Sequence, residues 1–134
     1  MEEEKIIYKA LSYKIVGVMY GVYNDLGYGY KEKIYERAIG RYFTINNIKF
    51  KCQVSYLIAF KGKIIGRCYL DFLVEDKIIV EIKIGDYFSK RNINQVREYL
   101  KATGLKLALI VNYTHYGVKV LRILNPNNRE SINS

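Results

Sequence analysis

Two apolar runs that meet at a polar turn, residues 70–84, constrain the fold of this chain more than any other segment. If residues 75–77 form a three-residue hairpin loop, Val74 faces Ile78 and the two runs form antiparallel strands. Side chains alternate between the two faces of a strand, so one face of this hairpin is entirely apolar. Its members are Leu70, Phe72, Val74, Ile78, Val80, Ile82 and Ile84. We therefore predict that this face packs against the core.

The other face of the hairpin carries charged side chains. Asp71 lies directly opposite Glu81, and Lys83 follows two residues later on the same face. Like charges in opposite positions destabilise a ladder, so a cation between the two carboxylates would relieve their repulsion. Mg²⁺ prefers oxygen ligands and is commonly held by one or two carboxylates together with substrate phosphates. The residues alone leave two interpretations open: a metal site with a lysine beside it, or charged pairs on the solvated face of a hairpin.

Length and composition predict one domain, residues 1–134, with a polyanionic partner. The formal net charge is +9 and the pI is about 9.5, which favours nucleic acid as that partner. The fourteen tyrosines could stack on bases or pack at the edge of the core. Cys52 and Cys68 are too few for a disulfide framework or a zinc site, so we interpret them as reduced core thiols of a cytoplasmic protein. The longest apolar run, 105–111, is far shorter than the roughly 20 residues of a membrane span, so no membrane contact is expected.

Hydrophobic spacing predicts the element order ααβββαββ, an α/β (α+β) fold with a mixed sheet and helices against it. The predicted helices are 2–24, 30–45 and 89–103, and the predicted strands are 51–60, 63–74, 78–84, 105–112 and 118–124. Ser89 is suited to cap the last helix and Gly104 to end it. The folded core is expected at about 5–124, and residues 125–134 are expected to form a frayed polar tail.

The second predicted helix carries two carboxylates on one face. Glu32, Tyr35 and Glu36 are spaced three and four residues apart, so they share a face of the helix. The side chains left to serve the core are Ile34, Ala38 and Ile39. Such a carboxylate pair either belongs to a site or is simply solvated.

The third predicted helix offers an amide and a phenol. Gln95 and Tyr99 lie one turn apart on one face, and Arg91 lies one turn earlier. A side-chain amide can position a water or a phosphate, and a phenol can support it. This spacing by itself is a weak indication of a site.

Several short motifs occur in the order and approximate spacing of a known family. The run Gly29-Tyr30-Lys31-Glu32-Lys33-Ile34-Tyr35 matches the signature of the GxxExxY proteins, which are small prokaryotic and viral domains of the PD-(D/E)XK nuclease superfamily. The segments 35–38, 71–75, 80–83, Gln95 with 99–104, and Asn112-Tyr113 continue the match. The resemblance covers about residues 5–124. The chain departs from the pattern in lacking a proline before Asp71 and in having Asn92 where members often have histidine.

This resemblance implies a restriction-endonuclease-like αβββαβ core, here with an extra N-terminal helix and a C-terminal strand. It also implies hydrolysis of phosphodiester bonds with Mg²⁺, or with Mn²⁺ as a substitute. Asp71, Glu81 and Glu32 would be the metal ligands. Lys83 would activate or position the attacking water. Gln95 and Tyr99 would orient substrate or solvent, which completes the implied catalytic set.

The leading hypothesis is therefore a Mg²⁺-dependent deoxyribonuclease in the cytoplasm, with the endonuclease or exonuclease mode and activity on RNA left open. The basic residues expected to contact backbone phosphates are Lys31, Lys33, Arg91 and Arg97. The alternative is a catalytically inactive module on a nuclease fold that binds nucleic acid or a protein, because a fold does not fix a function. A two-fold homodimer would suit cutting of both strands.

Overall fold

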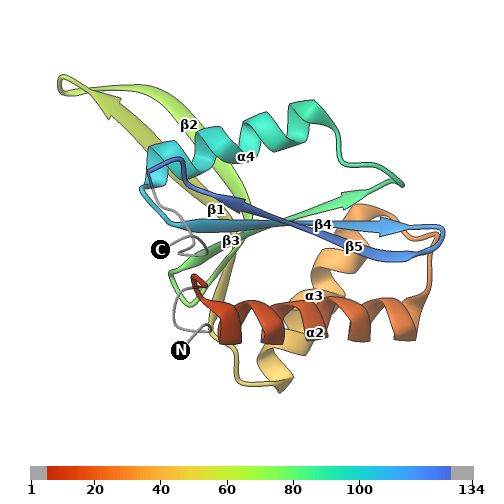
Figure 1. Ribbon diagram of the computed structural model, residues 1–134. Coiled ribbons are helices and arrows are strands. Elements are labelled where there is room, and N and C mark those ends of the chain that lie inside the picture. The colour runs from red at the N-terminus through yellow and green to blue at the C-terminus, as the bar shows by residue number, and fades with distance from the viewer. Residues whose placement is uncertain (1–5, 128–134) are drawn as a thin grey trace.

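A five-stranded mixed sheet with helices on both faces forms the protein (Figure 1). The computed structural model describes residues 6–127. Its helices are α2 (Lys9–Leu26), α3 (Glu32–Ile45) and α4 (Lys90–Thr103), and its strands are β1 (Phe50–Phe60), β2 (Lys63–Val74), β3 (Ile78–Ile84), β4 (Leu107–Thr114) and β5 (Gly117–Leu124). The strand order is β1-β2-β3-β4-β5, with β3 and β4 parallel and the other neighbours antiparallel. The predicted element order and mixed sheet are confirmed.

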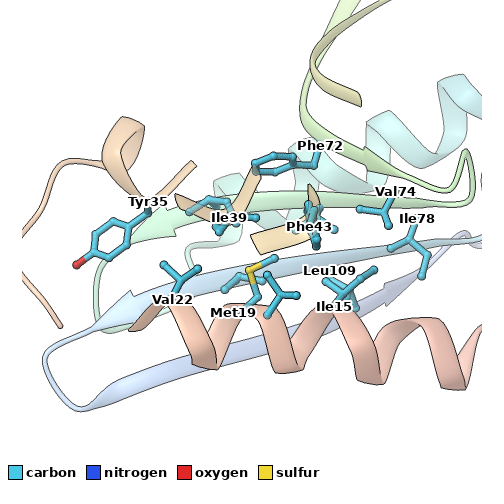
Figure 2. Close-up of a cluster of buried hydrophobic side chains, with 14 of the residues drawn as sticks. Ile15, Met19, Val22, Tyr35, Ile39, Phe43, Phe72, Val74, Ile78 and Leu109 are labelled. Carbon is cyan, nitrogen blue, oxygen red and sulfur yellow. The ribbon is translucent and has the colours of Figure 1, made fainter. Parts of the chain in front are cut away.

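Helices α2 and α3 cover one face of the sheet, and α4 covers the other (Figure 1). The larger core lies between the sheet and the α2–α3 pair. Figure 2 shows Met19 of α2 and Phe43 of α3 among side chains from the strands, including Val74 and Ile78. A smaller core lies under α4. In it, Val96 and Leu100 of α4 pack with side chains of β3 and β4 such as Ile79 and Ile110. The two cores fix α3 and α4 on opposite sides of β3.

The predicted hairpin has its predicted register. Val74 pairs with Ile78, and the Lys77 N–H donates to the Val74 carbonyl across a loop of residues 75–77. Both Glu75 and Asp76 adopt left-handed backbone conformations, which close this tight loop. Among the side chains of the predicted apolar face, those from Phe72 onward pack in the α2–α3 core.

Leu70 is the exception to the predicted apolar face, because it packs in the α4 core instead. Gln53, whose place in β1 is opposite Asp71, has a left-handed φ of 52°. Alternation of side chains is interrupted there. Phe50 packs in the α2–α3 core, whereas Val54, four residues on, packs in the α4 core. The same change of face separates Phe72 from Leu70 on β2, so strand parity predicts faces correctly only on one side of this irregularity.

Two sequence expectations about the ends of the fold are corrected. The first helix begins at Lys9, because Tyr8 has a left-handed φ of 53°, and the predicted positions 2–5 lie outside the described residues. Asn125, predicted to begin a frayed tail, is buried, and its amide donates to the carbonyls of Leu100 and Leu105. Positions 128–134 of that tail lie outside the described residues. Within residues 6–127, no helix has the length and apolar character needed to cross a bilayer.

The caps predicted for the last helix are confirmed. The Ser89 hydroxyl accepts a hydrogen bond from the Asn92 N–H at 3.0 Å, and Gly104 ends α4 with a left-handed φ of 73°. Both cysteines are free, as predicted. Cys68 is buried, but Cys52 is exposed, so the predicted core position of Cys52 is wrong.

The stripe through which helix α3 packs matches the predicted one at Ala38 and Ile39 but not at Ile34. Its buried residues are Tyr35, Ile39 and Phe43, spaced four residues apart, while Ile34 is 37% exposed. The Tyr35 ring stacks on Tyr113 with ring centroids 4.4 Å apart, and its hydroxyl donates to the Gly27 carbonyl. Tyr35 is therefore a core residue.

Replacing Phe43 by alanine should lower the free energy of unfolding by about 3–5 kcal/mol. Phe43 is fully buried, and its ring lies 5.3 Å from that of Phe50 and 5.6 Å from that of Phe72, centroid to centroid. Ile45 of the same helix is 63% exposed, so Ile45→Ala should change the stability by less than about 0.5 kcal/mol. Urea unfolding of both variants measures the difference. Equal losses would show that Phe43 does not anchor α3.

Candidate active site

The centre of the candidate site lies where β2 and β3 separate. Their pairing is regular from Val74–Ile78 to Phe72–Val80. Beyond it, the Asp71 N–H donates to Glu81 Oε2 at 2.8 Å, and the Ile82 N–H donates to Asp71 Oδ2 at 2.8 Å. Asp71 and Glu81 are thus neighbours, as the predicted register requires. Each carboxylate hydrogen-bonds to the opposite strand, which holds both side chains between the diverging strands.

Helix α3 brings two further carboxylates to Asp71. Oxygens of Glu32, Glu36 and Asp71 lie within 4.8 Å of one another. Glu32 was predicted to join the site. Glu36 was not assigned to it, although its spacing of one turn from Glu32 was the available signal. The Glu81 carboxylate is not a member of this trio, and it stays a predicted metal ligand.

Gln53 is a second polar residue that the sequence did not single out. Its amide donates to Glu36 Oε1 at 2.6 Å from the edge strand β1. Gln53 shares a cleft of about 390 Å³ with Glu32, Lys33 and Glu36. No sequence pattern marks it, because its position depends on the pairing of β1 with β2 and on its left-handed backbone.

Burial favours protonation of both strand carboxylates, and the charge of Asp71 adds to this effect at Glu81. Burial, followed by the charge of Asp71, raises the pKa of Glu81 to about 8. Burial also raises the pKa of Asp71, although the hydrogen bond from the Ile82 N–H and the charge of Lys83 act in the opposite direction. Glu81 is only 3% exposed, so water does little to relieve this repulsion.

The carboxylates on α3 have the same tendency. Burial is the largest cause that raises the pKa of Glu32 and of Glu36, and the charge of Asp71 raises both further. Lys83 lowers the pKa of all four acidic groups. One half-buried ammonium therefore faces four carboxyl groups and does not restore ordinary acidity to them.

Asn112 of β4 links β3, which carries Lys83, to the loop before α4. It pairs with Lys83 across the parallel β3–β4 ladder. Its buried amide donates to the carbonyls of Gly85 at 3.3 Å and Tyr87 at 2.9 Å. These bonds hold the loop between Lys83 and Ser89, the cap of α4, and so help to set where α4 begins.

From α4, the Tyr99 side chain reaches the splayed edge of β2. Tyr99 is 7% exposed and hydrogen-bonds with the backbone of Tyr69, two residues before Asp71. Burial, followed by the charge of Glu81, raises the pKa of its phenol. Gln95 lies one turn earlier on α4 and is exposed. The fold therefore brings Tyr99 close to the carboxylates and leaves Gln95 accessible to a ligand.

The four predicted phosphate-binding residues are all exposed, on two different elements. Lys31 and Lys33 lie at the start of α3, and Lys33 lines the cleft of Glu32 and Glu36. Arg91 and Arg97 lie on α4, on the other side of the sheet. A larger apolar groove of about 1030 Å³, lined by residues of α2 and β5, contains none of the predicted site residues.

The donor set fits a hard divalent cation. Oxygen ligands suit Mg²⁺ and Mn²⁺, whereas sulfur and imidazole ligands favour other metals. Glu32, Glu36 and Asp71, with oxygens within 4.8 Å of one another, supply such ligands. Burial raises the pKa of all three, and the charge of Asp71 raises those of Glu32 and Glu36 further, so a positive charge would stabilise their ionised forms. The residues present thus fit a metal of this class.

No curated protein matches this chain. Among solved structures, the fold is similar to "Crystal structure of SSO0001", with a TM-score of 0.55 and 20% sequence identity. That likeness covers 70% of this chain and 50% of the SSO0001 chain, so this chain corresponds to about half of that length. At this identity it shows the fold alone. A family model described as PD-(D/E)XK nuclease superfamily matches residues 9–123, and this chain, with its mixed sheet between helices, belongs to that superfamily.

Proposed function

We propose that this protein is a Mg²⁺-dependent nuclease that hydrolyses phosphodiester bonds of DNA. The observation that carries the proposal is the convergence of Asp71, Glu32 and Glu36 beside Glu81 and Lys83, in a chain of a nuclease superfamily. The net charge of +9 supports a polyanionic substrate. Membership of the GxxExxY group stays a prediction from residues 29–35. Free thiols such as Cys52 are consistent with the proposed cytoplasmic location.

Asp71, Glu81 and Glu32 would hold the metal, with Glu36 as a further ligand. A bound Mg²⁺ polarises a phosphoryl oxygen and makes water a stronger nucleophile. Hydrogen bonds from backbone N–H groups already orient the Asp71 and Glu81 carboxylates, so these side chains would lose little conformational freedom when a metal binds. Gln53 would hold Glu36 in place through its hydrogen bond.

Lys83 would orient the attacking water or stabilise negative charge that develops on the phosphate. Tyr99 would support the arrangement from α4, and the exposed amide of Gln95 would orient substrate or solvent. Lys33, in the same cleft as Glu32, would contact a phosphate next to the scissile bond.

The test is incubation of the protein with linear, circular, single-stranded and branched DNA, and with RNA, each with Mg²⁺, Mn²⁺ or EDTA. Cleavage of DNA is expected with either metal and not with EDTA, and the products distinguish endonuclease from exonuclease action. Lys83→Met should lower the rate about a hundredfold to a thousandfold. Lys77→Met, at an exposed position of the same hairpin, should leave the rate unchanged and is the matched control.

Absence of turnover with every substrate and metal would reject the nuclease and favour the inactive binding module. Retention of full activity by Lys83→Met would reject this site as the catalytic centre.

A further inference from the structure

Positive charge is concentrated in one segment of the chain. The 34 residues 37–70 contain seven basic residues and no acidic residue. The basic residues are Arg37, Arg41, Lys49, Lys51, Lys61, Lys63 and Arg67. Most of this segment is the β1–β2 hairpin, which we call the arm and define as residues 50–70.

The arm extends beyond the rest of the sheet (Figure 1). β1 and β2 pair along their whole length up to Lys63, whereas β2 pairs with β3 only at residues 72–74. The outer part of the arm is therefore a two-stranded ribbon. An isolated two-stranded ribbon is only marginally stable in water. Exposed apolar side chains on such a ribbon are therefore unexpected.

Apolar side chains are nevertheless exposed near its tip. Phe60 is 58% exposed, Ile64 is 60% exposed and Ile65 is 65% exposed. Lys61 and Lys63 lie beside them, and the Lys61 ammonium lies 5.5 Å from the centroid of the Phe60 ring. Contiguous exposed apolar side chains commonly mark a binding site, and here they alternate with cations.

The face of the arm opposite α4 leads towards the candidate active site, whereas Phe60 at the tip lies on the α4 side, because it shares strand parity with Val54 and Ile58 of the α4 core. Cys68 and Leu70 face α4, so Arg67 and Tyr69, which alternate with them, lie on the opposite face. Both are exposed, and Tyr69 is 63% exposed. Tyr69 is two residues from Asp71 on the same strand. A ligand on this face could continue into the carboxylate cluster.

The chemistry of this surface identifies its occupant. Lysine and arginine side chains suit a phosphate backbone. Among residues 6–127, Lys51 is the one basic side chain of the arm that forms an ion pair, with Asp76 at 3.2 Å. Aromatic rings suit the faces of bases, which are accessible in a single strand but hidden in the stack of an intact duplex. A second copy of the chain fits this surface less well. A symmetric contact between two arms would bring two groups of basic side chains together, and residues 37–70 contain no acidic residue to offset their repulsion.

We infer that the arm binds a single-stranded stretch of the substrate nucleic acid that passes around its tip, with Phe60 at the tip and Tyr69 on the face opposite α4 stacked on unpaired bases, and with Lys61, Lys63 and Arg67 on phosphates. This inference rests on the proposed function and narrows its substrate class. The preferred substrates are single strands and duplexes with a single-stranded flap or fork, rather than blunt duplexes.

The test measures binding without hydrolysis, by fluorescence anisotropy of labelled DNA in EDTA. The probes are a single strand, a blunt duplex and a flapped duplex of one sequence. Wild-type protein should bind the single strand and the flapped duplex more tightly than the blunt duplex. Tyr69→Ser and Phe60→Ser should each weaken single-strand binding about tenfold. Tyr13→Ser is the control, because Tyr13 is 81% exposed on α2.

The cations are tested by the salt dependence of the same binding. A Lys61→Gln, Lys63→Gln double variant should reduce the slope of log affinity against log salt by about 1.4 for a single strand. A Lys14→Gln, Lys106→Gln double variant removes the same charge from exposed sites outside the arm and should leave the slope unchanged.

Equal weakening by arm and control variants, or equal binding of all three probes by the wild type, would overturn the inference. So would a wild-type dimer in light scattering that becomes monomeric on Phe60→Ser, because the tip would then bind a second copy. Circular dichroism checks that each variant is folded. Because binding is measured in EDTA, a protein that proves catalytically inactive can still support the inference. If the protein is an active nuclease but the arm variants bind single strands as tightly as wild type, the inference is overturned and the proposed function is not.

Discussion

Asp71→Asn should lower metal-dependent cleavage by at least about a thousandfold, because a catalytic metal contributes several kcal/mol and about 1.4 kcal/mol corresponds to each factor of ten. The side chain keeps its size, and its amide oxygen can still accept the hydrogen bond from the Ile82 N–H. What is lost is the negative charge shared with Glu32, Glu36 and Glu81. Single-turnover cleavage assays with Mg²⁺ and Mn²⁺ measure the loss of rate.

The same substitution should not destabilise the metal-free protein. Removing one of several repelling buried carboxylates relieves the repulsion that raises the pKa of Glu81. Asp71→Asn should therefore unfold at the same or a higher urea concentration than wild type in EDTA, and should gain less stability than wild type on addition of Mn²⁺.

Asp76→Asn is the matched control for this experiment. It makes the same chemical change at an exposed position of the same hairpin, where Asp76 pairs with Lys51 at 3.2 Å. Its cleavage rate and its stabilisation by Mn²⁺ should equal those of wild type. If Asp71→Asn cleaves DNA as fast as Asp76→Asn, Asp71 is not part of a catalytic metal site.

The parts of this site that the sequence could predict are those set by local geometry. A three-residue loop fixes which residues of two strands face each other, so the neighbouring positions of Asp71 and Glu81 followed from the loop length alone. The caps of α4 followed equally from Ser89 and Gly104, since each satisfies backbone groups within a few residues of its own position.

The parts that could not be predicted depend on how elements pack. Spacing places Glu32, Tyr35 and Glu36 on one side of α3, but the rotation of α3 against the sheet decides which of them enter the core. Tyr35 became a core residue stacked on Tyr113, and the two carboxylates beside it were turned to Asp71. The contact of Gln53 with Glu36 links residues 17 positions apart, through a backbone irregularity that no local pattern marks.

That packing also makes the metal-free protein sensitive to pH through Glu81. Its pKa is raised from an ordinary value of 4.5 to about 8 in the folded protein, first by burial and then by Asp71. Between these values the folded protein retains a proton that the unfolded chain has released. The free energy of unfolding therefore falls as the pH rises through this window. The loss is absent below about pH 4.5 and complete above about pH 8.

Glu81→Gln should remove this loss. Glutamine does not titrate, and its oxygen can accept the hydrogen bond from the Asp71 N–H. In EDTA, urea unfolding from pH 4.5 to 9 should show wild type falling below the variant by a few kcal/mol at the alkaline end, with the two equal at the acidic end. Glu98→Gln, at an exposed position of α4, should follow the wild-type profile and serves as the control. Parallel profiles for wild type and Glu81→Gln would mean that Glu81 is ionised in the folded protein at neutral pH, and that its burial beside Asp71 is compensated without a metal.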